Sequence, residues 1–361
     1  MKITVIGGGV AGLSIGWKLA ASGADVTVLE RASAGHGATW AAAGMIAASA
    51  ESAEAGPAEA AFCAQSARMW PDFAGEIEEH SGKAISYRKD GVLIAAMNAA
   101  EAQALRTRAP SQFISASDAR AIAAILREDI AGGLWDPDEA QVDNRALGAA
   151  LALAFQRAGG TLSVNEAAVR IEMEGKRAVA ARTPFKVYFA DAFVLAAGAW
   201  TSQIAGLPDG TIPEIAPVKG EMISLQPRRG AQLPPCLLWG NGVYMAPRHG
   251  RLFVGATVEE AGFDTSLSDS AREFLFDRAK GLCPALGDWE IAEHWAGLRP
   301  RAPDRLPVLG ASAVENLFIA SGQFRNGILM APIIAETMAA LILNQSLPTD
   351  ISAFAPGRFA P

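Results

Sequence analysis

The chain has 361 residues, half of them hydrophobic, and its formal net charge is −7. This length predicts two domains with sizeable cores, because it exceeds what one ordinary core supports. The negative charge argues against nucleic acid or an anionic membrane as a partner. The three cysteines, Cys63, Cys236 and Cys283, have neither metal-site nor disulfide spacing, which favours a reducing cytoplasmic location.

Targeting and membrane segments are not expected. A predicted strand starts at residue 2, which leaves no room for a signal peptide before it. The apolar run at 38–50 is too short to span a bilayer, and the one at 328–343 is interrupted by Pro332, Glu336 and Thr337. The second run is therefore predicted to be a buried helix.

Residues 2–30 predict a strand, a glycine-rich turn, a helix and a second strand. Gly7, Gly9 and Gly12 have the spacing G-x-G-x-x-G, and the second apolar run ends at Glu30. Gly7 permits the tight turn, Gly9 lets the backbone approach a pyrophosphate, and Gly12 lets the helix lie close to the sheet. Glu30 is placed to accept hydrogen bonds from a ribose. The stretch predicts a dinucleotide site but leaves FAD and NAD(P) open.

The remaining elements alternate in a way that predicts two interleaved domains. Helices are expected at 60–80, in several pieces over 98–127, and at 144–158, 268–282 and 327–343; residues 51–59 read as an acidic surface loop and 132–138 as a turn. Short alternating strands near 218–225, 243–247 and 252–256 favour an antiparallel sheet. The predicted fold class is α/β with an α+β substrate domain: a discontinuous Rossmann-type domain over 1–80, 145–215 and 295–361, and a substrate domain over 81–144 and 216–294.

Six stretches occur in an order that resembles a known family. They lie at 7–30, 41–45 (AAAGM), 196–200 (AAGAW), 217–221 (PVKGE), 295–300 (WAGLRP) and 325–332 (RNGILMAP). Together they resemble the glycine oxidases in the D-amino-acid oxidase and sarcosine oxidase group of flavoenzymes, over nearly the whole chain. The resemblance implies that the dinucleotide is FAD. Since some sarcosine oxidases attach FAD to a cysteine and none lies at 301–309, noncovalent FAD is expected.

The resemblance also implies which residues surround FAD. Small side chains at 39–45 would let the backbone pass beside the isoalloxazine; the alternative is a packing surface of small residues. Val169 could equally be a core valine. The strand end, turn and helix start at 322–328 would aim a helix dipole at the pyrimidine end of the flavin. Trp40 and Gln323 depart from the family pattern, and Trp40 could reshape the pocket or cover the ring. The full set is Gly7, Gly9, Val10, Ala11, Gly12, Glu30, Arg31, Ala38, Thr39, Ala43, Gly44, Met45, Val169, Ala197, Gly198, Gly322, Gln323, Phe324, Arg325, Asn326, Gly327 and Ile328.

Three residues are candidates for substrate binding. Arg299 lies among apolar neighbours, and its guanidinium fits a carboxylate bidentately; the alternative is an internal ion pair. Tyr244 could donate a second hydrogen bond to the carboxylate, or it could be a half-buried sheet aromatic. Arg325 matches a family position beside substrate and flavin, or it could pair with an acid at a helix start. None of the four histidines has metal-site spacing, so no metal is expected, and no strong general base is evident.

These features together predict an FAD-dependent oxidase of glycine and other small amino acids such as sarcosine. The α-hydrogen would leave as hydride to the flavin, and the products would be a 2-oxo acid, ammonia or an amine, and hydrogen peroxide from dioxygen. The alternatives are a D-amino-acid or D-hydroxyproline dehydrogenase that uses another electron acceptor, or a non-catalytic flavin-binding subunit. By resemblance, a homo-oligomer such as a tetramer and a role in thiamine biosynthesis are also expected.

Overall fold

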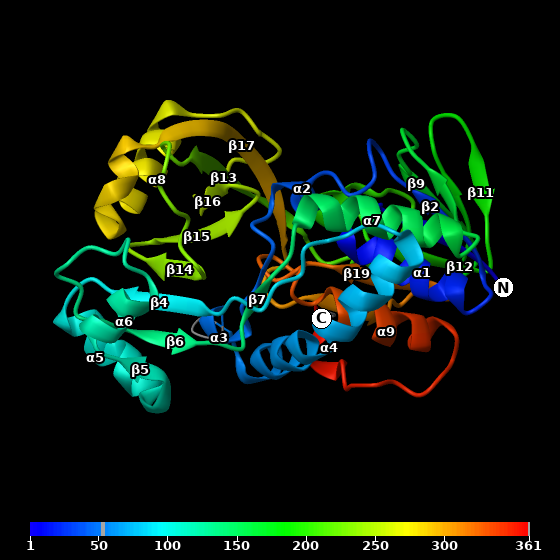
Figure 1. Cartoon of the computed structure of the whole chain (residues 1–361). Helices are drawn as coiled ribbons and strands as arrows, with labels where there is room; N and C mark the ends of the chain where they lie inside the picture. The colour runs from blue at the N-terminus through cyan, green and yellow to red at the C-terminus, as the bar shows by residue number, and fades with distance from the viewer. Residues whose placement is uncertain (52–54, 360–361) are drawn as a thin grey trace.

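The computed structural model describes residues 1–51 and 55–359, which form two lobes that are each built on one large sheet (Figure 1). The large sheet of the first lobe contains six strands in the order β18-β19-β12-β1-β2-β8. These strands run parallel, except that β18 pairs antiparallel with β19. They come from the start, the middle and the end of the chain: β1 (Lys2–Ile6), β2 (Asp25–Leu29), β8 (Thr161–Ser163), β12 (Ala192–Leu195), β18 (Val308–Ala311) and β19 (Leu317–Ser321).

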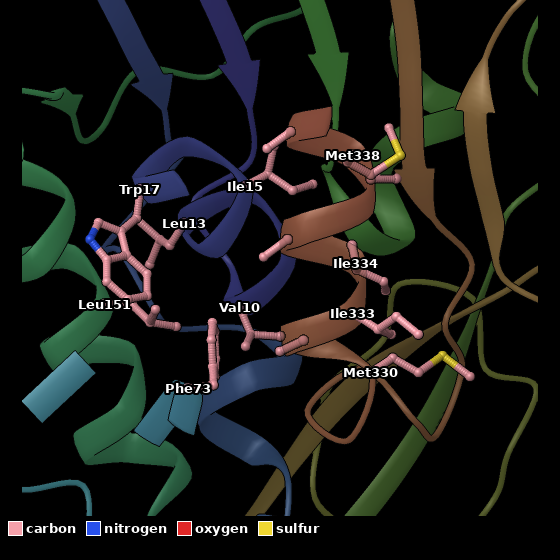
Figure 2. Close-up of a cluster of buried hydrophobic side chains, with 14 of the residues drawn as sticks. Val10, Leu13, Ile15, Trp17, Phe73, Leu151, Met330, Ile333, Ile334 and Met338 are labelled. Atoms are coloured by element: carbon pink, nitrogen blue, oxygen red, sulfur yellow. The ribbon is translucent and has the colours of Figure 1, made fainter. Parts of the chain in front are cut away.

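Four helices cover one face of this sheet. Strand residues that alternate toward this face, such as Val5 and Val28, share a buried core with the helices, and Figure 2 shows side chains of all four helices meeting in it. Residues one position out of phase, such as Ile6 and Leu29, pack instead against a three-stranded sheet. The lobe therefore has three layers. The helices are α1 (Val10–Ala21), α4 (Pro57–Ser81), α7 (Asn144–Arg157) and α9 (Ala331–Ile342), and the small sheet contains β9 (Arg170–Glu174), β10 (Arg177–Arg182) and β11 (Val187–Phe189).

The second lobe is an eight-stranded sheet in the order β17-β13-β16-β15-β14-β4-β6-β5. Its pairs are antiparallel except β14 with β4. One face packs against α6 and α8, and the other turns toward the first lobe. The strands are β4 (Val92–Ala96), β5 (Phe113–Ile114), β6 (Gly132–Asp136), β13 (Ala216–Gln226), β14 (Leu237–Gly240), β15 (Val243–Arg248), β16 (Arg251–Gly255) and β17 (Glu290–Arg301); the helices are α5 (Ala99–Arg108), α6 (Ala116–Ile122) and α8 (Asp269–Leu282).

Short elements join the lobes: α2 (Ala38–Ala41), α3 (Ala48–Glu51) and the two-stranded sheet of β3 (Met45–Ile46) with β7 (Ala140–Gln141). The predicted α/β fold with a parallel and an antiparallel sheet is confirmed. No helix within 1–51 and 55–359 is both long and apolar enough to cross a bilayer.

Two local predictions are wrong. Residues 132–136 form strand β6 rather than a turn, because they pair antiparallel with β4, where a Cβ on Gly133 would lie 2.7 Å from the Ile94 carbonyl oxygen. Helix α9 begins at Ala331 rather than at residue 327, and Pro332 occupies its first turn. The sequence pattern did not reveal either feature, because both depend on contacts with distant segments.

Candidate active site

A cavity of about 720 Å³ lies between the two large sheets. Its volume is in the range of roughly 300–1,000 Å³ that is usual for ligand and cofactor sites. The carboxyl ends of β1, β2 and β12 contribute to its wall, as expected for a ligand site in an open α/β sheet. Most residues predicted from the sequence line it: Gly7, Gly9, Val10, Ala11, Glu30, Arg31, Ala38, Thr39, Ala43, Gly44, Met45, Val169, Ala197, Gly198, Tyr244, Arg299, Gln323, Phe324, Arg325, Asn326, Gly327 and Ile328.

Gly12 and Gly322 are the two predicted cofactor residues that lie outside the lining. A Cβ on Gly12 would collide with the Gly7 carbonyl, so this glycine lets α1 approach the turn after β1. Gly322 has φ 75°, and a Cβ there would lie 3.2 Å from Val308 Cγ2. Both residues shape the walls of the cavity through backbone packing rather than by facing into it.

The end of the cavity near β2 has the features of an ADP site. Glu30 accepts hydrogen bonds from Gly8 N–H at 2.8 Å and Ala32 N–H at 2.9 Å, which fix its carboxylate at the strand end. The N-terminus of α1 opens on the cavity at Gly9, Val10 and Ala11, and such a terminus favours phosphate. The guanidinium carbon of Arg31 lies 3.4 Å from the centroid of the Trp200 ring.

The segment 38–45 lines the cavity while other residues hold it from behind. Asn144 Nδ2 donates to the carbonyls of Thr39 at 2.7 Å and Trp40 at 2.8 Å. Arg248 Nη1 donates to Ala43 O at 3.1 Å, and Trp295 Nε1 donates to Ala41 O at 3.0 Å. Burial lowers the pKa of Arg248 to about 10, so this guanidinium stays charged at neutral pH. These bonds leave the small side chains of the segment facing the cavity.

Trp40 is not among the residues that line the cavity, whereas its neighbours Thr39 and Ala41 are. Its ring stacks on His36 at 5.9 Å between centroids and lies 3.8 Å from the guanidinium carbon of Arg145. It also meets Trp295 of β17 at 6.2 Å. Trp40 therefore contributes to the contact between the lobes.

The turn at 322–328 forms another wall. Phe324 has φ 46° and donates its N–H to Pro300 O at 2.8 Å, which sets the turn against β17. Gln323 is 5% exposed and lines the cavity, and its Nε2 has no hydrogen-bond partner among the described residues. Since a buried amide donor without a partner is costly, this atom fits a ligand in the cavity. The start of α9 at Ala331 puts the predicted helix dipole one turn further along the chain than expected.

Arg299 on β17 and Tyr244 on β15 lie at the end of the cavity formed by the eight-stranded sheet, although residues 295–301 were predicted to belong to the Rossmann-type domain. Arg299 Nη1 donates to Thr257 O at 3.1 Å and Lys219 O at 3.4 Å, and no described carboxylate forms an ion pair with it. Burial raises the pKa of Tyr244, partly offset by the nearby charge of Arg299, so the hydroxyl stays protonated and can donate. The alternative considered for Arg299, an internal ion pair, is therefore not found among the described residues. The guanidinium is placed to bind the carboxylate of a ligand.

Arg325 is paired with an acid, as the alternative reading of this residue anticipated. Its Nη2 lies 2.8 Å from Glu51 Oε2, and both residues line the cavity. Glu51 and Glu59 are not surface residues, contrary to the prediction for 51–59: their side chains are largely buried, and Glu59 accepts a hydrogen bond from Asn326 at 3.0 Å. Residues 52–54 of that stretch lie outside the described residues.

Several lining residues were missed by sequence reasoning. Glu51 and Trp239 have no recognisable motif, and they reach the cavity only because distant segments fold together. Trp200 ends the stretch at 196–200 that carries the family resemblance, but it was not named as a site residue. Gly220 and Met222 carried a usable signal: both lie in the alternating stretch that forms β13, where residues two apart share one face.

Comparison with known proteins agrees with this geometry. Residues 2–341 match the family model described as FAD dependent oxidoreductase. The chain belongs to this family. Over 98% of this chain and 95% of the relative, it is 31% identical to the glycine oxidase of Geobacillus kaustophilus. The crystal structure of glycine oxidase from that organism superimposes with a TM-score of 0.93 over 99% of this chain and 98% of the other.

The chain is also 36% identical to the bifunctional protein ThiO/ThiG of Synechocystis sp., over 99% of this chain but 54% of that protein. It therefore spans about half the length of this relative. Family membership confirms FAD as the cofactor and confirms the flavoenzyme resemblance predicted from the sequence. The cavity fits this cofactor, since it runs from Glu30 to Arg299 and contains the unpartnered Gln323 Nε2.

Proposed function

We propose that this protein is an FAD-dependent oxidase of glycine and other small amino acids, including sarcosine and small D-amino acids. The observation that carries the proposal is Arg299, a guanidinium in the cavity without an acidic partner among the described residues, beside the protonated hydroxyl of Tyr244. The likeness to glycine oxidases supports the choice of substrate class.

Bound FAD would supply the two-electron oxidation of the amine and the transfer of the electrons to dioxygen. The residues of the chain would bind and orient the substrate. Arg299 would hold one carboxylate through a bidentate pair, and Tyr244 would donate to it. Fixing the carboxylate fixes the position of the α-carbon, so orientation accounts for much of the rate enhancement.

The acids in the cavity wall are already engaged. Glu30 accepts two backbone N–H groups, and Glu51 pairs with Arg325. This arrangement suits a substrate that reacts as its neutral amine and needs no strong protein base. Met222 Sδ lies 3.8 Å from the Tyr244 hydroxyl and narrows this end of the cavity, which favours small side chains on the substrate.

The decisive experiment is anaerobic reduction of the holoenzyme by glycine, sarcosine, D-alanine and D-proline, followed by absorbance. Bleaching by glycine with peroxide release under air supports the oxidase. Bleaching without peroxide indicates the dehydrogenase alternative, and the lack of bleaching by any substrate indicates a flavin-binding subunit. Arg299→Ala should raise KM for glycine by about 100-fold or more, since a charged hydrogen-bond pair is lost; unchanged substrate affinity contradicts the carboxylate assignment.

A homo-oligomer and a role in thiamine biosynthesis remain predictions of the resemblance. Light scattering of the purified holoenzyme tests the first, and complementation of a thiamine-requiring strain tests the second.

A further inference from the structure

A buried ion pair lies directly behind Arg299. Gly220 and Met222 of β13 line the cavity, and because side chains alternate along a strand, Lys219 and Glu221 lie on the opposite face. Lys219 Nζ is 2.9 Å from Glu221 Oε1, and the two side chains are 4% and 0% exposed.

Neighbouring elements enclose this pair. Glu221 Oε2 accepts a hydrogen bond from the N–H of Ser268, the N-cap residue of α8, at 3.1 Å, and it lies 2.7 Å from His294 Nε2 on β17. Burial opposes ionisation of Glu221, but the hydrogen bonds from Lys219 and from Ser268 N–H lower its pKa overall. The hydrogen bond to Glu221 raises the pKa of Lys219. Both groups are therefore charged at neutral pH.

The pair connects to Arg299 through the backbone. The carbonyls of Lys219 and Thr257 are the two acceptors of Arg299 Nη1. Thr257 is bonded twice to Glu221: its Oγ1 accepts Glu221 N–H at 2.9 Å, and its N–H donates to Glu221 O at 3.2 Å. One of the two carbonyls that orient the guanidinium thus belongs to Lys219 itself, and the other belongs to Thr257, whose main chain and hydroxyl are bonded to the backbone of Glu221.

A buried ion pair adds little net stability, because the desolvation of two charges offsets their attraction. We propose that Lys219 and Glu221 are positioning residues that hold the Arg299 guanidinium in the orientation that binds the substrate carboxylate. The inference rests on the proposed function in one respect, the assignment of Arg299 to the carboxylate.

The test measures carboxylate binding without turnover. Acetate is titrated into the holoenzyme, and its dissociation constant is read from the change in flavin absorbance. Lys219→Met should raise this constant and the KM for glycine by about tenfold while kcat changes less, and Lys219→Arg should restore part of the affinity. Lys89→Met, which breaks the exposed Lys89–Asp138 pair, is the matched control and should bind acetate like the parent. An acetate constant for Lys219→Met within about twofold of the parent overturns the proposal.

A milder variant decides the question if Lys219→Met does not fold. Ser268→Ala removes the hydroxyl that caps α8 and donates to Glu221 Oε1 at 3.3 Å, while it keeps the backbone N–H; Ser115→Ala removes the equivalent cap of α6. Only Ser268→Ala should weaken acetate binding, by about threefold; equal effects of the two variants overturn the proposal.

Arg299→Ala separates the positioning role of Lys219 and Glu221 from the assignment of Arg299 to the carboxylate. If it leaves acetate binding unchanged, the carboxylate assignment of the proposed function fails. If it abolishes binding while the Lys219 and Ser268 variants bind like the parent, the positioning role fails.

Discussion

Gly220 is the residue on which the Arg299 guanidinium lies. A Cβ at this position would overlap the guanidinium, while the backbone conformation accepts an alanine. Gly220→Ala should therefore displace Arg299 and lower kcat/KM for glycine by about 10- to 100-fold, which corresponds to ~1.4–2.7 kcal/mol. Steady-state kinetics measures this change. Gly75→Ala in α4, where a Cβ meets nothing within 4 Å, is the control and should leave kcat/KM unchanged; equal kinetics for both variants would be contrary to the site geometry.

Glu139 gives the protein a pH-dependent stability. It is 6% exposed, and burial raises the pKa of its carboxyl to about 7, although the hydrogen bond from Ser49 opposes the shift. Because the folded state holds the proton more tightly than the unfolded state, its contribution to stability is lost as pH rises from about 4.5 to about 7. Glu139→Gln should remove of the order of 1–3 kcal/mol of this pH dependence.

Denaturant unfolding at pH 5.5 and pH 8 measures the effect. The parent should lose more stability between the two values than Glu139→Gln does. Glu79→Gln, at an exposed position of α4, is the control and should follow the parent. A Glu139→Gln protein with the same pH dependence as the parent would show that the carboxyl is ionised throughout.

Single residues differ in how far the sequence predicts their role. Gly7, Gly9 and Glu30 are predictable because their task depends on local backbone geometry and fixed spacing. Glu51 is not, since its partner Arg325 lies far away in the chain and the two meet only in the folded protein. The orientation of Trp40 is not predictable for the same reason: its neighbours in sequence line the cavity, but its ring packs against Arg145 and Trp295.

Among the elements, α4 connects the core to the cavity wall. Ser66 Oγ and Trp70 Nε1 both donate to the Leu329 carbonyl, at 2.7 Å and 3.0 Å, directly after the turn that lines the site. Trp70→Phe should cost about 1 kcal/mol of unfolding free energy through the lost hydrogen bond, besides the cost of the smaller ring, and it should weaken FAD binding severalfold.

Trp17→Phe is a matched control for this change. Trp17 is equally buried, but its Nε1 has no partner among the described residues, so the substitution removes volume without removing a hydrogen bond. Denaturant unfolding and FAD titration of both variants provide the comparison. If Trp17→Phe weakens FAD binding as much as Trp70→Phe, the anchoring role of α4 is wrong.

Helices and strands are predictable from the sequence where local patterns determine them, and they are not where contacts with distant segments do. Helix α4 was evident from its amphipathic pattern. Helix α7 was evident from a capping residue at its start, for which the sequence left Asp143 and Asn144 open; Asp143 is the cap, and it accepts the N–H groups of Arg145 and Ala146. Strand β6 was not evident from the sequence, because Gly132, Gly133 and Trp135 are typical of a turn when their pairing with β4 is not known. The start of α9 was placed too early, since residues 327–330 are apolar like the helix but form turns anchored to α4.

At the scale of the whole molecule, the two lobes share one cavity, and its ends lie on different sheets. Trp295 of β17 bonds to the segment at 38–45, and the aromatic cluster around Trp40 covers the junction. None of the three cysteines lines the cavity, and noncovalent attachment of FAD stays a prediction. The cofactor is therefore expected to be removable, and its binding is expected to couple the two lobes.

FAD and ADP should consequently stabilise the apoprotein differently. ADP can occupy only the end of the cavity near Glu30 and α1, whereas FAD extends to the walls formed by residues 322–328 and by the eight-stranded sheet of the second lobe. FAD at about 100 times its dissociation constant should add ~2.7 kcal/mol to the unfolding free energy and merge the unfolding of both lobes into one transition. ADP at the same concentration should raise the unfolding temperature less and leave the second lobe melting separately. Differential scanning calorimetry with each ligand measures the unfolding temperatures and the number of transitions. Equal stabilisation by ADP and FAD would mean that the flavin half of FAD adds no binding energy and does not couple the two lobes.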